Sequence, residues 1–483
     1  MDPQPSRVDA RAPQAGRPSA RERSRRAVRR LAAGLALATA AGCGGEAPPA
    51  PPPNLVLISI DSLRADRLGC YGAERDTSPA IDALCARGVR FEQAVAPTSW
   101  TLPSHVTLLT GQPIPVHRVV HPETRIDPER TLLAEHLRAQ GYRTAGFVSA
   151  PFLHRSYGFS RGFDRWENFG AGGEPPSDEA HAMSHHDETA PQVVGAALGW
   201  LAERPVGDPQ PWFLFVHLWD VHYDFIPPAP YDRMFDPDYA GDLSPLGFQG
   251  NPAINPDMPA RDLEHLRALY DGEIRWLDSQ LAPLLATLGV REGYERVVIG
   301  LVADHGEEFF EHGQKGHYKN LFDTTVHVPF ILVDAGRLAP RTVPGLVGLE
   351  DVAPTLLGLA GLPPLAEALG RDLSAPLLAG ASLEAESTPQ LLTLRQQRGL
   401  RGDGWKVIED VASGYAVYYD LAADPDEQDP KPARSAAPDR LEELEAAEAA
   451  AERHADGLRW SDGEGAALSP DLEERLRELG YLD

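Results

Sequence analysis

A threonine precedes a short helical pattern in the segment SWTLPSHVTLLTG, which runs from residue 99 to residue 111. Pro103 and Ser104 suit the first turn of a helix. Backbone N–H groups there have no partner within the helix, so proline loses nothing by lacking one, and serine can accept a hydrogen bond from another. Thr101 would then face the positive end of this helix, which attracts anions through its backbone amides. A threonine at this position is either a capping residue or a nucleophile.

Three apolar runs each end on an aspartate. The runs NLVLISI, WFLFVHLW and VVIGLVA directly precede Asp61, Asp220 and Asp304. Each run is typical of a strand that is buried on both faces of a parallel sheet. Ligands of open α/β sheets bind at the carboxyl ends of the strands. Three carboxylates at that edge repel one another, so the pattern indicates a bound cation.

An aspartate and a histidine follow each other in the run ADHGEE, where Asp304 is followed by His305. Carboxylate oxygen and imidazole nitrogen together suit Zn, Mn or a similar divalent ion. Asp61 adds a ligand from another strand end, and the hydroxyl of Thr101 can complete the set. A cation on that hydroxyl would favour its ionisation and produce a nucleophile near neutral pH.

Helical and strand patterns alternate along most of the chain, with helices expected over residues 132–141, 190–203 and 263–288. This alternation predicts an α/β fold with a mostly parallel central sheet and helices on both faces. After Pro389 the pattern changes to short strands and turns, which predicts a small C-terminal antiparallel subdomain. We expect the catalytic domain over residues 54–378, the subdomain over 379–430 and an acidic helical tail over 431–483.

The amino terminus predicts export. Residues 1–43 combine an arginine-rich start with an apolar stretch that is too short to span a bilayer. The small residues before Cys43 resemble a bacterial lipobox, in which the cysteine is lipidated; the alternative is a plain signal peptide with a chance cysteine. Gly44 favours the outer membrane. Residues 44–53 form a Pro-rich linker.

The composition of the chain limits the classes of partner that it can bind. Its net charge is −26, which argues against nucleic acid, because phosphate contacts need a basic face. An anionic ester in a locally positive pocket remains compatible with this charge. Cys70 and Cys85 can form one disulfide in an oxidising compartment, although the usual burial of cysteine favours two thiols.

Long motifs follow one another along the chain: IDSLRADRLGCYG, then TSPAIDALCARGVRFEQAVAPTSWTLPSHVTLLTG, FVHLWDVH, ADHGEEFFEHGQKGHYKNLFDTTVHVPFIL and WKVIED…YYDLAADPDEQ. In this order they resemble the sulfatase family of the alkaline-phosphatase superfamily, over residues 54–429. The resemblance implies that superfamily's α/β fold and C-terminal subdomain. By position, it implies that Asp61, Asp304 and His305 bind metal and that Thr101 is the nucleophile.

Two departures from the family pattern bear on the reaction. Arylsulfatases carry Cys or Ser, followed by x-Pro-Ser-Arg, and convert that first residue to formylglycine; this chain has Thr101 and, in place of the arginine, His105. The usual acidic pair after the first strand is Asp61 and Ser62, which weakens a calcium site. The chain therefore resembles the threonine-using branches of the superfamily, which include phosphodiesterases and phosphotransferases.

The number of metal ions stays open at this point. One or two divalent ions (Zn, Mn or Ca) are expected, because the threonine-using branches often hold two. Asp220, His222 and His317 are the candidate ligands of a second ion. The alternative is that His222 and His317 bind the oxygens of the substrate, together with His105 and Lys319.

Three functions compete. The first is a hydrolase of sulfuric or phosphoric esters with a covalent Thr101 intermediate, acting on a small or polymer-linked anionic ester. The second is an envelope phosphotransferase, which the lipid anchor suggests. The third is a catalytically silent binder of anionic glycans, which the presence of Thr101 and the expected ligands disfavours.

Overall fold

Strand β1 (Asn54–Ile60) lies at the centre of the main sheet in the computed structural model, which describes residues 52–170, 189–205, 207–290, 296–458, 465–479 and 481–482. From Leu55 onward its side chains are fully buried, as expected for an apolar run between two neighbouring strands. It pairs in parallel with β5 (Trp212–Leu218) and β6 (Val297–Ala303). The three strands that precede the aspartates are therefore adjacent.

The remaining strands of this sheet extend it on both sides, in the order β4-β3-β5-β1-β6-β8-β2-β7, with β9 beside β2. Strands β3 and β4 continue the parallel part, whereas β8 runs antiparallel to β6. The expected mostly parallel sheet is confirmed. The bounds of these outer strands are β2 (Val89–Val95), β3 (Arg143–Val148), β4 (Arg165–Asn168), β7 (His327–Val328), β8 (Phe330–Asp334) and β9 (Arg341–Gly348).

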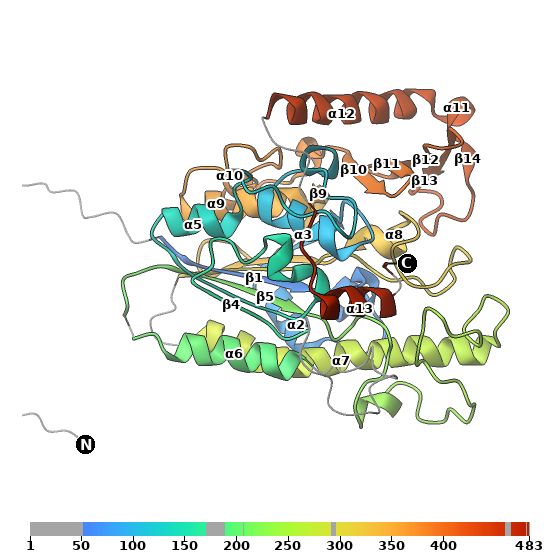
Figure 1. Cartoon of the computed structure of the whole chain (residues 1–483), viewed down its shortest axis with the longest axis horizontal. Coiled ribbons are helices and arrows are strands. Elements are labelled where there is room, and N and C mark those ends of the chain that lie inside the picture. The colour runs from blue at the N-terminus through green and yellow to red at the C-terminus, as the bar shows by residue number, and fades with distance from the viewer. Residues whose placement is uncertain are drawn as a thin grey trace, which may run out of the picture. The chain divides into compact units, whose positions relative to one another are not determined.

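Helices cover both faces of the sheet (Figure 1). On one side lie α6 (Ala190–Ala202) and the long α7 (Ala260–Val290). On the other side lie α3 (Thr101–Thr110), α5 (Leu133–Ala139) and α9 (Val352–Ala360). This arrangement confirms the expected layers. Shorter helices are α2 (Pro79–Cys85), α4 (Ile114–His117), α8 (Asp323–Val326) and α10 (Ser374–Leu378).

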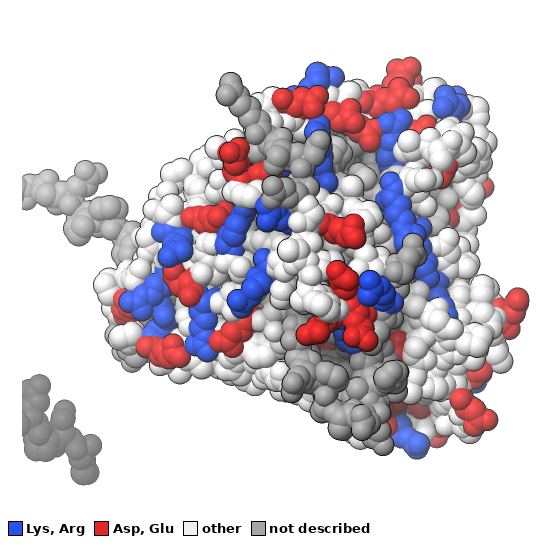
Figure 2. All heavy atoms as spheres, viewed as in Figure 1, with Lys and Arg blue, Asp and Glu red and all other residues white. Residues whose placement is uncertain are grey.

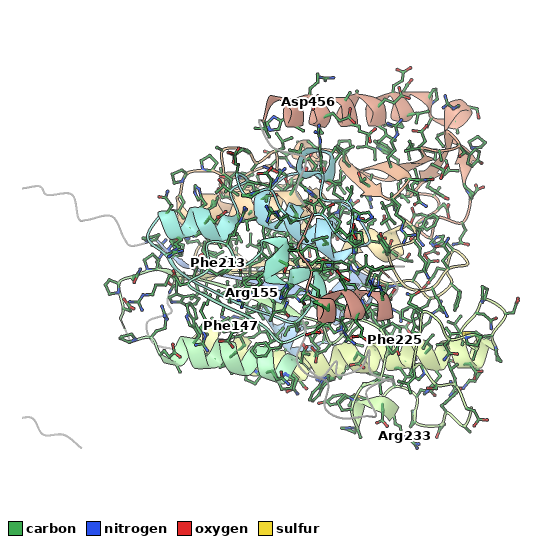
Figure 3. All side chains as sticks on the ribbon, viewed as in Figure 1. Phe147, Arg155, Phe213, Phe225, Arg233 and Asp456 are labelled. Carbon is green, nitrogen blue, oxygen red and sulfur yellow. The ribbon has the colours of Figure 1, made fainter. Side chains whose placement is uncertain are left out.

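Aromatic side chains fill much of the space between the sheet and its helices. Figure 3 labels Phe147 on β3 and Phe213 on β5, and both are completely buried. Phe163 stacks on Phe213, with ring centroids 5.9 Å apart. Such rings bury large apolar areas and so contribute strongly to the core.

A second sheet of five antiparallel strands forms the C-terminal subdomain and confirms its prediction. Helix α12 (Pro438–Gly457) packs on this sheet through Leu441 and Leu444, which join a separate apolar cluster with Leu400 and Val407. The strands are β10 (Gln390–Leu394), β11 (Gln397–Gly402), β12 (Trp405–Asp410), β13 (Tyr415–Asp420) and β14 (Lys431–Pro432), followed by the short α11 (Ala433–Ala436).

The last helix of the chain, α13 (Pro470–Glu478), lies beside the main sheet (Figure 1). It packs against a 3-10 turn, η3 (Pro151–Leu153). Leu472, Leu476 and Leu479 are buried and belong to the main core. Burying each of these leucines contributes about 1.5–3 kcal/mol. The expected acidic tail is therefore helical, but its end is part of the catalytic domain's core.

Two expectations concern features outside this core. Cys70 and Cys85 are free thiols.

The expected signal peptide, lipobox and most of the linker lie outside the described residues. Within the described residues, no helix has the length and apolar character needed to cross a bilayer.

A buried lysine joins the antiparallel subdomain to the main domain. Lys406 on β12 is completely buried, and its Nζ lies 2.5 Å from Asp323 and 2.7 Å from Glu427. It also donates a hydrogen bond to the backbone oxygen of Leu321, at 3.0 Å. Burial alone would raise the pKa of Asp323, but the charges of Lys406 and Arg401 together outweigh it and lower that pKa.

We predict that Lys406→Met lowers the free energy of unfolding by about 3–5 kcal/mol, because it leaves the buried Glu427 without its cation and Asp323 with Arg401 alone. Urea unfolding followed by circular dichroism measures the change. The control is Lys431→Met, which alters an exposed lysine of the same subdomain and should shift stability by less than about 0.5 kcal/mol. Equal stability of the two variants would contradict this role of Lys406.

Candidate active site

Two buried carboxylates lie side by side at the carboxyl ends of β1 and β6. Ile60 is paired with Ala303 across these strands, so Asp61 and Asp304, which follow them, are neighbours. Both are completely buried. Asp304 Oδ1 accepts hydrogen bonds from the backbone amides of Ser62 (3.2 Å) and His305 (2.9 Å). Asp304 Oδ2 has no hydrogen-bond partner.

The electrostatics of this pair call for a positive charge. Burial and the neighbouring Asp61 raise the pKa of Asp304 well above its ordinary value. Burial would also raise the pKa of Asp61, but a hydrogen bond from His217 and nearby histidines lower it. A divalent cation between the two carboxylates would stabilise both in their ionised form.

Thr101 is the first residue of α3, and Trp100 occupies the N-cap position without a side-chain cap. The helix therefore begins earlier than expected. The Thr101 hydroxyl lies 3.4 Å from Asp61 Oδ2 and 3.3 Å from His305 Nε2. Thr101 is therefore not the cap of this helix, and its hydroxyl faces a carboxylate and an imidazole.

His305 completes the group. Its Nδ1 donates a hydrogen bond to the backbone oxygen of Gly306, at 2.9 Å, so in the neutral ring Nε2 carries the lone pair. That Nε2 lies 3.5 Å from Asp304 Oδ2 and 3.7 Å from Asp61 Oδ1. Ligand atoms of these three residues all lie within 4.8 Å of one another. The mixed oxygen and nitrogen donors and the unpartnered Asp304 oxygen fit a divalent ion such as Zn or Mn.

A second cluster lies next to this group and consists of His105, His217 and Asp304. His105 Nδ1 donates to the backbone oxygen of Thr101, at 2.8 Å, and its Nε2 contacts Ser59 Oγ at 3.0 Å. Both ring nitrogens of His105 are thus engaged, and the ring supports the backbone of Thr101. Neither nitrogen is left for the expected contact with the substrate.

His217 is a site residue that the sequence analysis missed. Its Nε2 lies 3.4 Å from Asp61 Oδ2, and its ring is completely buried. Ser59 pairs with His217 across β1 and β5, so the two residues, together with Asp61, have side chains on one face of the sheet. The signal in the sequence is a histidine three residues before the aspartate at the end of a buried strand.

Asp220 does not join the site. Its carboxylate accepts hydrogen bonds from the Thr189 hydroxyl (3.0 Å) and the Ala190 amide (2.9 Å), at the beginning of α6. In the described part of the chain, the close groups of three possible ligand residues do not include Asp220 with His222 and His317. The Asp220 carboxylate thus caps α6, and a second metal ion on Asp220, His222 and His317 stays a prediction.

His222 and His317 lie together instead, with ring centroids 4.7 Å apart. His222 Nδ1 donates to the backbone oxygen of Tyr223, at 2.7 Å, and its buried Nε2 has no hydrogen-bond partner. Burial and the neighbouring His317 lower the pKa of His222 well below its ordinary value, so the ring is neutral near pH 7. Because Nδ1 carries the hydrogen of this neutral ring, Nε2 of His222 can accept a hydrogen bond but has none to donate to a substrate oxygen.

Two further residues of the site come from outside the expected set. Glu307 Oε2 lies 3.1 Å from His317 Nδ1, and burial raises the pKa of Glu307 to about 8. The hydroxyl of Tyr481 lies 2.8 Å from His317 Nε2. Glu307 is recognisable in the run ADHGEE, whereas nothing in the sequence near Tyr481 indicates its position.

Lys319 lies close enough for its charge to act on Glu307 and His317. Its Nζ donates to Gln249 Oε1, at 2.7 Å, and to the backbone oxygen of Lys315, at 3.0 Å. Burial lowers its pKa. These two bonds leave one ammonium hydrogen for an anionic substrate.

On the face drawn in Figure 2, acidic and basic side chains are interspersed, so attraction of an anion from this side depends on such local groups.

Comparison with known proteins agrees with this geometry. The family model described as Sulfatase matches residues 53–362. The chain belongs to the sulfatase family. The family identified from the motifs is thereby confirmed, and with it the class of sulfatase-like ester hydrolases.

Individual relatives span most of this chain. It is 25% identical to the ulvan-active sulfatase of Formosa agariphila, over 78% of this chain and 76% of the relative. The crystal structure of the phosphonate monoester hydrolase of Agrobacterium radiobacter superposes with a TM-score of 0.68 at 24% identity, covering 83% and 96% of the two chains. A structure in complex with its substrate D-glucosamine-2-N,6-O-disulfate gives 0.65 at 16% identity, covering 84% and 99%.

We predict that Asp304→Asn removes bound metal from the purified protein, because it replaces a charged ligand by a neutral one. Elemental analysis after dialysis measures the metal content. In the presence of EDTA the variant should be at least as thermally stable as the wild type, since one of two adjacent buried carboxylates is gone. The control, Asp220→Asn, should keep its full metal content; loss of metal there would contradict the placement of Asp220.

Proposed function

We propose that the protein hydrolyses a phosphoric or sulfuric ester in two steps, with Thr101 as the nucleophile. The observation that carries this proposal is the convergence of the Thr101 hydroxyl with His305 Nε2 and Asp61 Oδ2, at 3.3 and 3.4 Å. A silent binding site would not need this grouping of a hydroxyl with a carboxylate and an imidazole.

The residues that would hold a divalent ion are Asp61, Asp304 and His305, with the hydroxyl of Thr101. Such an ion, when bound, favours ionisation of the hydroxyl and neutralises charge on the substrate. The hydrogen bonds from the amides of Ser62 and His305 keep Asp304 Oδ1 oriented. His105 holds the first turn of α3 through the Thr101 carbonyl.

In the first step, Thr101 Oγ1 attacks the phosphorus or sulfur atom, and the bond from that atom to the alcohol oxygen breaks. The hydroxyl loses its proton, and the departing alcohol oxygen gains one, so that an alcohol leaves and Thr101 is esterified. The backbone amides at the beginning of α3 face the anionic group. The remaining ammonium hydrogen of Lys319 provides a contact for one of its oxygens.

In the second step, water attacks the esterified group, which releases inorganic phosphate or sulfate and restores the Thr101 hydroxyl. The unpartnered Nε2 of neutral His222 is suited to accept a proton from this water. We favour a phosphoric ester. Phosphothreonine can be hydrolysed at phosphorus, whereas a sulfated threonine lacks the elimination route that a formylglycine hydrate provides.

We predict that Thr101→Ala lowers turnover by several orders of magnitude, because the covalent step is lost. Thr101→Ser should keep much of the activity, since the hydroxyl remains. Assays on p-nitrophenyl phosphate, a p-nitrophenyl phosphodiester and p-nitrophenyl sulfate measure both variants with the metal-loaded enzyme. Thr107→Ala, an alanine variant of the same helix, should change activity far less than Thr101→Ala. Normal turnover of Thr101→Ala on every ester would rule out Thr101 as the nucleophile.

We further propose that the protein is an exported lipoprotein, anchored through Cys43 in the outer membrane. The arginine-rich start, the short apolar stretch and the Pro-rich residues that follow support this proposal. The mature protein should begin at a lipidated Cys43, and Cys43→Ala should prevent lipidation. Mass spectrometry of the amino terminus measures this. A mature chain that still begins at Met1, or that begins beyond Cys43, would contradict the anchor.

A further inference from the structure

Tyr481, close to the end of the described residues, reaches the active site. Tyr481 follows α13, and its hydroxyl lies 2.8 Å from Nε2 of His317, a candidate substrate-binding residue. The Tyr481 side chain is almost completely buried. A residue separated from His317 by most of the C-terminal part of the chain thus contributes a polar group to the site.

Tyr481 is held firmly in this position. Its backbone amide donates to the oxygen of Leu476, at 2.9 Å, so the chain turns back at the end of α13. Its ring packs edge-on against Phe152, with centroids 4.7 Å apart, and against Tyr318 at 5.5 Å. The buried leucines of α13 connect the same segment to the main core. Tyr481 is therefore a fixed part of the site's wall.

The position of the hydroxyl gives it a role beyond packing. His317 Nδ1 is engaged by Glu307, so Nε2 is the ring nitrogen that faces the remainder of the site, and Tyr481 is its partner. Tyr223 also borders this place, with its ring stacked on that of His317 at 4.9 Å. The Tyr481 hydroxyl also forms a hydrogen bond with that of Tyr223. When His317 Nε2 donates to the phenol oxygen, the phenol hydrogen is the one that Tyr223 accepts, and a substrate oxygen can accept it in place of Tyr223.

We propose that Tyr481 contacts the substrate, with its hydroxyl oriented by His317 and donating a hydrogen bond to an oxygen of the bound phosphoric or sulfuric ester. The proposal rests on the function proposed above and adds a group that the C-terminal segment supplies. It makes α13 a part of the active site, because the helix holds the ring that carries this donor.

The test compares Tyr481→Phe, which keeps the ring and removes the hydroxyl, with the wild-type full chain. We expect kcat/KM for the best ester to fall about tenfold, as for loss of one hydrogen bond to an anion. The melting temperature should fall by only about a few degrees, because the packing with Phe152 and Tyr318 remains although His317 Nε2 loses its partner. The matched control is Tyr415→Phe, which removes an exposed hydroxyl of β13 and should leave kcat/KM unchanged.

A second measurement separates this proposal from the proposed function. Calorimetric titration of the metal-loaded protein with inorganic phosphate and with sulfate should show weaker binding to Tyr481→Phe than to the wild type, whether or not the wild type turns over esters. Turnover by the wild type with identical kinetics and anion binding in Tyr481→Phe would overturn the contact while sustaining the hydrolase. A higher kcat/KM in Tyr481→Phe would also overturn it, and would show that the tail obstructs His317.

Discussion

The enforced proximity of two buried carboxylates, Asp61 and Asp304, is the constraint on which the site depends. Burial of charge is costly unless partners compensate for it. Around this pair the chain places the imidazoles of His305 and His217, the amide of Ser62 and the hydroxyl of Thr101. These groups compensate for part of the buried charge, and the divalent ion proposed above would compensate for the rest and make the hydroxyl reactive.

This proximity follows from the backbone. Because β1 and β6 are parallel and in register, the residues that follow them meet at one edge of the sheet. Ser62 then has a φ of 54°, in the left-handed region that non-glycine residues rarely adopt. The Tyr270 hydroxyl donates to its backbone oxygen, at 2.7 Å, and helps to hold this turn. The bend points the Ser62 amide at Asp304 rather than into the sheet.

The C-terminal third contributes to the catalytic domain in two different ways. Through Lys406 the antiparallel sheet is joined to Asp323 by a buried ion pair. Through the leucines of α13 the last segment enters the main core and brings Tyr481 to His317. The antiparallel sheet also shares the main core, through Leu392, Leu394 and Ile408.

The sequence by itself determined the strand and helix pattern, and hence the fold class, because periodicity and burial are local properties of a segment. It also determined that Asp61, Thr101, Asp304 and His305 belong together, since the family motifs retain their order. Only the tertiary structure decided that Asp220 caps α6, that His105 supports Thr101, and that His217 and Tyr481 reach the site. Those outcomes depend on which face a side chain occupies and on which distant segment packs against it, and neither is encoded in the spacing of residues along the chain.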